Sequence, residues 1–227
     1  TGAMDVVLEA FRAPPRLRFA ARMLGWPFKW LGLKGDPDLP PATRALTALG
    51  PAYIKFGQVL STRPDIVGEE LAAQLKYLQD KLPPFPTGTA KKMIEAELEL
   101  PVSTLFSDFS EPVAAASIAQ VHKARLAETG EEVAVKVLRP GIERAFRKDI
   151  DAFYLAARWI ERLAPFSRRL RPVEVIRHFE GVVMGELDLR LESSAAAEFA
   201  ANTAGDAGFQ VPKPHWFLSS RNVMTLG

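Results

Sequence analysis

The stretch 112–140, PVAAASIAQVHKARLAETGEEVAVKVLRP, decides what fold the sequence predicts. It contains two runs of alternating apolar and polar residues joined by Glu128-Thr129-Gly130, a pattern typical of a β-hairpin. In the second run, Glu131 to Leu138, successive side chains point to opposite faces of the strand. One face carries Val133, Val135 and Val137, and the other carries Ala134, Lys136 and Leu138. We therefore expect an antiparallel hairpin that presents one lysine on the face opposite three valines.

Helical patterns lie on both sides of this hairpin. Apolar residues recur at helical spacing over 42–62, 67–80 and 89–99, from Pro140-Gly141 to Leu163, and from Pro172 to Asn202. Two short strand-like pieces follow, QVPKPHWFL and NVMTL, with a turn at Ser219–Asn222. This order of helices, hairpin, helices and strands predicts an α+β fold with a mainly antiparallel sheet.

Composition excludes several classes of site. The 227 residues are 48% hydrophobic and 25% charged, enough for an ordinary core, and the net charge of +2 gives no reason to expect nucleic acid as a partner. There is no cysteine, which excludes disulfides and thiolate metal sites and favours a reducing compartment. The three histidines, His122, His178 and His215, lack metal-ligand spacing, so we expect surface or structural roles for them and no metal site.

Lys136 is the most informative candidate for a binding residue. In a nucleotide-binding lobe, a small residue such as Ala134 leaves room for the base, and a lysine two residues further reaches phosphate. The preceding turn, Ala114-Ala115-Ala116-Ser117, stands where a kinase has its glycine-rich phosphate loop. Two plainer interpretations stay open: an edge-strand lysine and a tight alanine-rich strand crossing.

A lysine that holds phosphate usually needs a carboxylate partner, and the last helical pattern offers Glu186, Asp188 and Glu192. On one continuous helix, Glu186 and Glu192 lie about 120° apart. Two acids on different faces suit two cations, Lys136 and Lys55. A charged helix face turned to solvent is the alternative interpretation.

Lys55 stands in a segment that is otherwise apolar, GPAYIKFGQVLSTRPD at residues 50–65. A helix that is apolar on all sides is normally buried, where an unpaired lysine is costly. Gln58 lies about 60° from Lys55 around such a helix, so both can reach one pocket. Gly57 costs roughly 1 kcal/mol in helix propensity, and we interpret it as clearance for another helix.

The N-terminal segment is basic and aromatic. Between Phe11 and Gly35 there is no acidic residue, and four aromatic residues interleave with six positive charges: Arg12, Arg16, Arg18, Arg22, Lys29 and Lys34. One interpretation is an amphipathic segment on an anionic membrane surface, and the other is a helix packed on the rest of the protein. No run of 18 apolar residues occurs, so we expect a cytoplasmic chain, peripheral at the inner membrane face in the first interpretation.

Four stretches in the chain, in order, resemble the UbiB family, the aarF-domain-containing atypical kinases. They are LGPAYIKFGQVLSTRPD, LQDKLPPFP, AAASIAQVHKARLAETGEEVAVKVLRPGI and ELDLRLESSAAAEFAAN. The resemblance implies a protein-kinase-like N-lobe with an N-terminal helical extension over the active site. It also implies ATP or ADP with Mg²⁺ as cofactor, and a role in ubiquinone or related isoprenoid-lipid biosynthesis.

The resemblance assigns roles residue by residue. Lys55, Gly57 and Gln58 match the family's K-x-G-Q signature, whose lysine pairs with the glutamate of an E-x-D motif, here Glu186 and Asp188. Ala114 to Ser117 match the alanine-rich loop, Lys136 the phosphate-contacting lysine, and Glu192 the glutamate that pairs with it. Ser193-Ser194 departs mildly from the EAAN that commonly follows this glutamate.

The largest departure is that no catalytic-loop Asp–Asn pair and no D-F-G-like motif occurs in the 227 residues. We therefore expect a piece of a longer protein: a basic segment at 1–40, a helical extension at 41–110, and an N-lobe at 111–227 that stops at the hinge, with the metal ligands in a missing C-lobe. Such a piece should not turn over by itself. TGAM looks like a cloning remnant, and Gly227 stands where the family usually has Glu.

Two functional hypotheses follow. The first is a nucleotide-binding atypical kinase or ATPase whose further partners are an isoprenoid lipid, an anionic membrane surface or other quinone-biosynthesis proteins. The second is a non-catalytic lipid- or protein-binding module at a membrane surface. A typical protein kinase fits poorly, because the extension would place Lys55 and Gln58 where a protein substrate docks.

Overall fold

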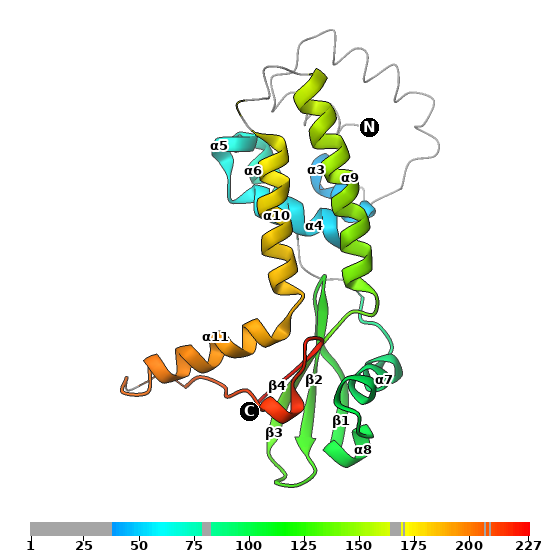
Figure 1. Ribbon diagram of the computed structural model, residues 1–227, viewed down its shortest axis with the longest axis vertical. Coiled ribbons are helices and arrows are strands. Elements are labelled where there is room, and N and C mark those ends of the chain that lie inside the picture. Colours follow the sequence, from blue (N-terminus) through cyan, green and yellow to red (C-terminus); the bar gives the residue numbers. More distant parts are fainter. Residues whose placement is uncertain (1–37, 79–82, 164–168, 170, 207, 209) are drawn as a thin grey trace. The chain divides into compact units, whose positions relative to one another are not determined.

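The computed structural model describes residues 38–78, 83–163, 169, 171–206, 208 and 210–227 (Figure 1). The basic N-terminal segment expected at residues 1–40 therefore lies almost wholly outside the described residues. The chain divides into two compact units, which we describe separately. The helical unit comprises Thr1–Asp80 and Ala145–Glu180, and the sheet unit comprises Lys81–Arg144 and Gly181–Gly227.

The described part of the helical unit begins with two short helices, α3 (Pro41–Leu49) and α4 (Pro51–Ser61). Gly50 between them has φ +119°, a conformation that favours glycine, and Pro51 has no N–H to continue a helix. The prediction of a single helix over 42–62 is therefore wrong, because the chain forms two helices separated at Gly50. Likewise, α5 (Pro64–Val67) and α6 (Glu69–Leu75) meet at Gly68, where one helix was expected over 67–80.

The described part of the helical unit also contains most of two long helices, α9 (Ile142–Leu163) and α10 (Pro172–Glu186), and their starts agree with the prediction. Four aromatic rings pack together where α4, α9 and α10 meet, with centroids 4.7 to 5.9 Å apart: Tyr53, Phe56, Phe153 and Phe179. The Tyr154 hydroxyl also donates to Glu180 Oε2 at 2.7 Å, which joins α9 to α10. Aromatic packing of this kind explains the apolar character of α4.

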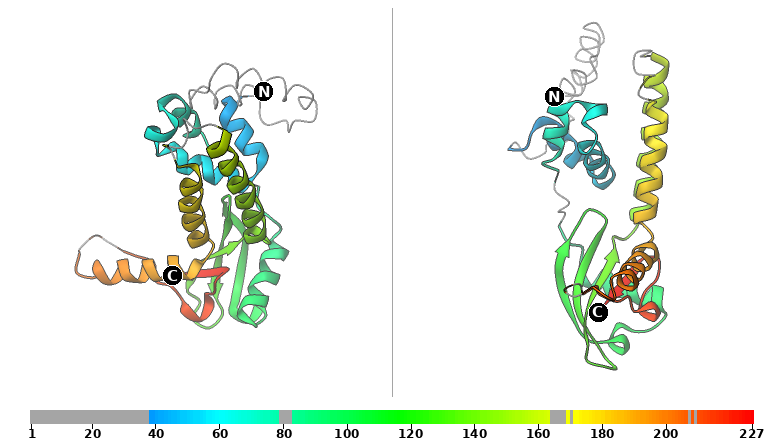
Figure 2. Two further views of the ribbon diagram at one scale, coloured as in Figure 1. Left: turned by 45° about the horizontal axis from the view of Figure 1, so that its top comes forward. Right: turned by 90° about the vertical axis from the view of Figure 1, so that its left-hand side faces the viewer.

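The sheet unit contains a four-stranded antiparallel sheet in the order β1-β2-β3-β4 (Figures 1 and 2). Its strands are β1 (Phe106–Ala115), β2 (Ala119–Leu126), β3 (Glu132–Leu138) and β4 (Val223–Leu226). The predicted hairpin is β2–β3, with Gly130 at φ +74° in its turn. The α+β class is confirmed, although β1 begins six residues before the alternating stretch that starts at Pro112.

One face of the sheet packs against two helices, α7 (Thr87–Leu98) and α8 (Val102–Leu105). The three valines of β3 are at most 4% exposed and share a core with Ile94 and Val102. The predicted division of β3 into a valine face and a lysine face is therefore confirmed. α7, α8 and β1 belong to the sheet unit, whereas most of α9 and α10 belong to the helical unit. The predicted limits at 41–110 and 111–227 do not follow this division.

The helix predicted from Pro172 to Asn202 is interrupted. α10 ends at Glu186, Leu187 and Asp188 are not helical, and α11 (Leu189–Asn202) begins afresh. The 120° separation expected for Glu186 and Glu192 on one helix is therefore wrong. Beyond α11, the strand-like QVPKPHWFL is a single bridge at Pro214 and a 3₁₀ turn, η3 (Trp216–Leu218), instead of a strand.

Within the described part of the chain, no helix is both long and apolar enough to cross a membrane.

Candidate functional site

The candidate site is built around an ion pair between β3 and α11. Lys136 Nζ donates to both oxygens of the Glu192 carboxylate, at 2.8 Å to Oε1 and 2.7 Å to Oε2. The lysine side chain is 25% exposed and the glutamate side chain 49%. A pair that is this accessible keeps its ammonium within reach of a ligand while the carboxylate holds it in place.

The surroundings of Lys136 are small or apolar. Ala134, on the same face of β3, is exposed, whereas Leu138 is buried. The neighbouring strands place Val121 of β2 and Met224 of β4 directly opposite Lys136. The same face carries Lys123, which lies directly opposite Ala134 and pairs with Glu132 at 2.9 Å. Lys136 therefore lies beside apolar neighbours, and a second lysine of this face is already paired with a carboxylate.

The start of α11 sets the position of Glu192. Asp188 is the N-cap residue: its Oδ1 accepts from the Arg190 N–H at 3.2 Å, and its Oδ2 pairs with Arg190 Nη2 at 2.6 Å. The hydrogen bond from the Arg190 side chain lowers the pKa of Asp188. The Leu189 N–H donates to the Arg221 carbonyl at 3.0 Å, and this ties α11 to the turn before β4. Glu192 lies in the first turn of α11, so these contacts at the start of the helix also fix the position of Glu192.

The turn before β4 is fixed from two further sides. Glu97 of α7 accepts from Ser220 Oγ at 2.6 Å and from Asn222 Nδ2 at 2.7 Å. The Arg221 guanidinium lies 3.2 Å from a Glu143 carboxylate oxygen. Because the same turn holds Leu189, these contacts support the position of α11 as well.

The alanine-rich stretch is only partly a turn. Ala114 and Ala115 lie in β1, opposite Val121 and Gln120 of β2. The turn closes where the Ala116 N–H donates to the Ala119 carbonyl at 2.8 Å. Ser117 is fully buried, so its side chain packs inside the sheet unit.

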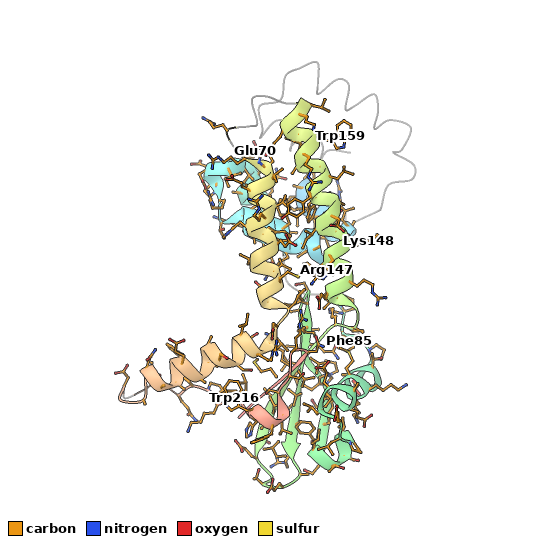
Figure 3. The ribbon with its side chains drawn as sticks, viewed as in Figure 1. Glu70, Phe85, Arg147, Lys148, Trp159 and Trp216 are labelled. Carbon is orange, nitrogen blue, oxygen red and sulfur yellow. The ribbon has the colours of Figure 1, made fainter. Side chains whose placement is uncertain are left out.

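Two residues that the sequence analysis did not single out, Arg139 and Gln120, contact this region. Arg139 donates to the Ala116 carbonyl through Nε at 3.0 Å and Nη2 at 2.9 Å. Gln120 binds both backbone groups of Phe85, a residue labelled in Figure 3. Its Oε1 accepts from the Phe85 N–H at 2.9 Å, and its Nε2 donates to the Phe85 carbonyl at 3.2 Å. Gln120 and His122 point to the buried face of β2. Because buried polar side chains need hydrogen-bond partners, their position in the alternating pattern could have identified Gln120 from the sequence.

His122 is a structural histidine, as expected. Gln120 Nε2 lies 2.9 Å from His122 Nε2, and His122 Nδ1 lies 2.9 Å from the Ser110 carbonyl. The amide nitrogen can only donate and the carbonyl can only accept, so the ring is neutral with its proton on Nδ1. Burial lowers the pKa of His122.

In the helical unit, Gly57 leaves the clearance that was predicted. A Cβ atom there would lie 2.2 Å from Leu78 Cδ1 and 2.7 Å from Leu46 Cδ1. Lys55 and Gln58 are half-buried on the same helix. Glu186 belongs to the sheet unit. The pairing of Lys55 with Glu186 therefore joins two units that are described separately, and it stays a prediction.

Among the described residues, no group of three or more Asp, Glu or His side chains is placed to hold a metal ion. The residues assembled in the sheet unit are a lysine, a carboxylate partner and a small-residue loop. Chemically, this set can bind an anion such as a phosphate group.

Comparison with known proteins identifies the family. A model of the ABC1 atypical kinase-like domain matches residues 77–227. Several relatives carry the name Probable protein kinase UbiB. That of Pseudomonas paraeruginosa is 43% identical over 226 residues, covering 98% of this chain and 42% of the relative. The relative from Enterobacter sp. is 42% identical, and the match covers 98% of this chain and 41% of the relative. The relative from Marinobacter nauticus is 43% identical, and the match covers 98% of this chain and 40% of the relative. The chain spans about two fifths of the length of these relatives.

Proposed function

Since the chain belongs to the UbiB family of ABC1 atypical kinase-like proteins, we propose that the whole protein binds ATP or ADP with Mg²⁺ and acts as an atypical kinase or ATPase. The pathway that we propose for it is ubiquinone or related isoprenoid-lipid biosynthesis. The single observation that supports nucleotide binding best is the ion pair between Lys136 on β3 and Glu192 on α11.

In this proposal, Lys136 binds a nucleotide phosphate and Glu192 holds its ammonium in position. The exposed Ala134 leaves space for the base on the same face of β3. The loop of Ala114, Ala115, Ala116 and Ser117 lies near the phosphates, because its small side chains let the backbone approach closely. A lysine ammonium and backbone N–H groups are the usual donors to nucleotide phosphates.

The metal has a different source in this proposal. Mg²⁺ neutralises charge on the phosphates when it is bound, and its ligands in protein kinases are the Asp of a D-F-G motif and the Asn of the catalytic loop. The described residues supply the phosphate side of the site, and Asp188 is already engaged as a helix cap. We expect the 227-residue chain alone to bind nucleotide without turnover.

The helical unit has a regulatory role in this proposal. The Lys55 of the K-x-G-Q signature would pair with the Glu186 of the E-x-D motif, and this pairing would control what can enter the nucleotide site. The half-burial of Lys55 and Gln58 supports this role, since side chains in such positions normally have specific partners.

The test is the thermal unfolding of the full-length protein with nucleotide and Mg²⁺. At 100 times Kd, ADP should raise the free energy of unfolding by about 2.7 kcal/mol. Lys136→Ala should remove this increase, whereas Lys92→Ala, at an exposed lysine on α7, should keep it. A full-length protein whose stability is unchanged by ADP and ATP would contradict nucleotide binding.

A second candidate function is the membrane-surface module, and one feature of α9 favours it. Leu155, Trp159 and Leu163 are spaced four residues apart and are 58%, 53% and 67% exposed (Figure 3). Together with the basic segment at 12–22, such a face could rest on anionic lipid. Pull-down with anionic vesicles tests it: reversal of Arg12, Arg16, Arg18 and Arg22 should abolish binding, and unchanged binding would contradict this version.

A further inference from the structure

Arg139 follows β3 directly and contacts the alanine-rich turn twice. Its guanidinium donates to the Ala116 carbonyl through Nε at 3.0 Å and Nη2 at 2.9 Å, and its backbone N–H donates to the Ile118 carbonyl at 2.8 Å. Two nitrogens of one planar group on one oxygen hold that oxygen in direction as well as distance. The turn between β1 and β2 is therefore attached to the end of β3.

The same guanidinium also holds the segment before α7. Nη2 donates to the Pro83 carbonyl at 2.9 Å, and the Phe85 ring lies under the charge with its centroid 5.8 Å away. Gln120 fixes Phe85 independently through its backbone. One arginine side chain thus joins three pieces of chain: the end of β3, the alanine-rich turn and residues 83–85.

We propose that Arg139 is a positioning residue of the nucleotide site, which holds the turn of the Ala114–Ser117 loop in the conformation that receives phosphate. This inference rests on the proposed function, because the loop is assigned to phosphate only there. A loop that is ordered before the ligand arrives does not lose conformational freedom on binding, and this strengthens binding. Arg139 adds side-chain hydrogen bonds to the backbone bond from the Ala116 N–H to the Ala119 carbonyl that closes this turn.

The contacts also set the expected selectivity. Arg139 touches backbone carbonyls of the loop, and its guanidinium is engaged by them and by Phe85. Its removal should therefore weaken the binding of phosphate groups and leave contacts to the base unchanged. Lysine cannot replace it, because a single ammonium lacks the fork that binds Ala116 and Pro83 together.

The experiment compares ADP with adenosine, both with Mg²⁺, on full-length wild type, Arg139→Lys and Arg139→Gln. We expect the Kd for ADP to rise at least tenfold in both variants and the Kd for adenosine to stay within about twofold. Hydrogen exchange of the backbone amides at 116–119 should become faster in Arg139→Lys, which reports the loop directly. The matched control is Arg125→Gln. Arg125 also donates to a backbone carbonyl in a turn, that of Gly130 at 2.8 Å, but this turn joins β2 to β3 and is not part of the alanine-rich loop.

The outcomes separate the two proposals. If wild type binds neither ADP nor ATP, the proposed function fails. If wild type binds ADP and Arg139→Lys binds it equally well, only the role of Arg139 fails. Equal losses for ADP and adenosine, the same loss in Arg125→Gln, or loss of the fold in both Arg139 variants would also overturn it, since each indicates a general structural role.

Discussion

At the scale of single residues, the Lys136–Glu192 pair combines good geometry with substantial exposure. Both carboxylate oxygens accept from one ammonium at 2.7 and 2.8 Å, yet the glutamate side chain is 49% exposed. Exposed ion pairs typically contribute less than about 1 kcal/mol to stability, because water competes and side-chain entropy is lost. The pair therefore matters for where the ammonium lies, more than for how stable the fold is.

The first prediction is that loss of this ion pair affects nucleotide binding more than it affects the stability of the fold. Glu192→Gln in the full-length protein should weaken ADP binding about tenfold, roughly the effect of 1.4 kcal/mol, while the free energy of unfolding changes by less than about 1 kcal/mol. Titration calorimetry and urea unfolding measure the two quantities. Glu198→Gln, at an exposed glutamate on the same helix, is the control and should change neither. A destabilisation of several kcal/mol with unchanged ADP affinity would contradict the assignment.

Gly57 gives the second prediction. Alanine there gains up to about 1 kcal/mol of helix propensity, but its Cβ would displace the leucine methyls of Leu46 and Leu78, and overpacking costs about 1–3 kcal/mol. The steric cost should win, because Leu78 is only 7% exposed and has little room to move. We expect Gly57→Ala to lower the free energy of unfolding by about 1 kcal/mol, measured by urea unfolding.

The matched control for Gly57 is Gly181, a glycine inside α10. A Cβ at Gly181 would meet no described atom within 4 Å, so Gly181→Ala should stabilise by up to about 1 kcal/mol. Opposite signs for the two substitutions would establish that packing, and not helix propensity, decides the residue at position 57. If Gly57→Ala also stabilises, the clearance has no energetic role.

At the scale of elements, the hairpin could be predicted and the helix break could not. The alternation in 119–138 and the turn at Gly130 are local properties, and local patterns survive in the folded chain. Leu187, Leu189 and Leu191 alternate with polar residues across the break between α10 and α11, but a period of two does not by itself place the start of a new helix at Leu189. The break depends on a distant contact, from the Leu189 N–H to the Arg221 carbonyl.

The residues that hold the candidate site in place could not be predicted from the sequence either. Lys136 and Glu192 were identified because their residue types stand in a recognisable pattern. Arg139 and Gln120 were missed because they bind backbone groups 23 to 56 residues away, and a backbone carbonyl has no sequence signature. Buried polar residues in a strand indicate that a partner exists, without saying which one.

His122 gives the third prediction, which concerns β2. Burial lowers its pKa below the ordinary value of about 6.5, and protonation at Nε2 would place two donors, the ring and Gln120 Nε2, against each other. The unfolded chain therefore binds the proton more readily. Stability from this group is complete above about pH 6.5 and is lost as pH falls through the window between the unfolded and folded pKa.

We therefore expect the free energy of unfolding to fall by at most about 1.4 kcal/mol per pH unit below pH 6.5 through this one group. His122→Gln should reduce the slope by one proton, even though it also lowers stability by removing the ring contact with Phe109. Urea unfolding at several pH values measures the slope. His178→Gln, at an exposed histidine, should leave it unchanged, and an unchanged slope in His122→Gln would contradict the neutral, buried state.

At the scale of the whole molecule, the chain consists of two units that are interleaved in sequence. Each of α9 and α10 begins in one unit and ends in the other, so two helices and the segment near residue 80 connect the units. The candidate nucleotide site lies in the sheet unit, and the K-x-G-Q signature lies in the helical unit. Any regulation of one by the other requires a specific contact between them.

The predicted contact is the pair of Lys55 and Glu186, and charge reversal tests it. In the full-length protein, Lys55→Glu and Glu186→Lys should each change the Kd for ADP and the free energy of unfolding, since each places like charges together. The double variant restores an opposite-charge pair, so its effects should be smaller than the sum of the single effects by about 0.5–3 kcal/mol. Lys76→Glu, at an exposed lysine after α6, is the control and should be additive with Glu186→Lys. Additivity of Lys55→Glu and Glu186→Lys within about 0.5 kcal/mol would mean that the two side chains do not meet, and the helical unit would then need another route to the nucleotide site.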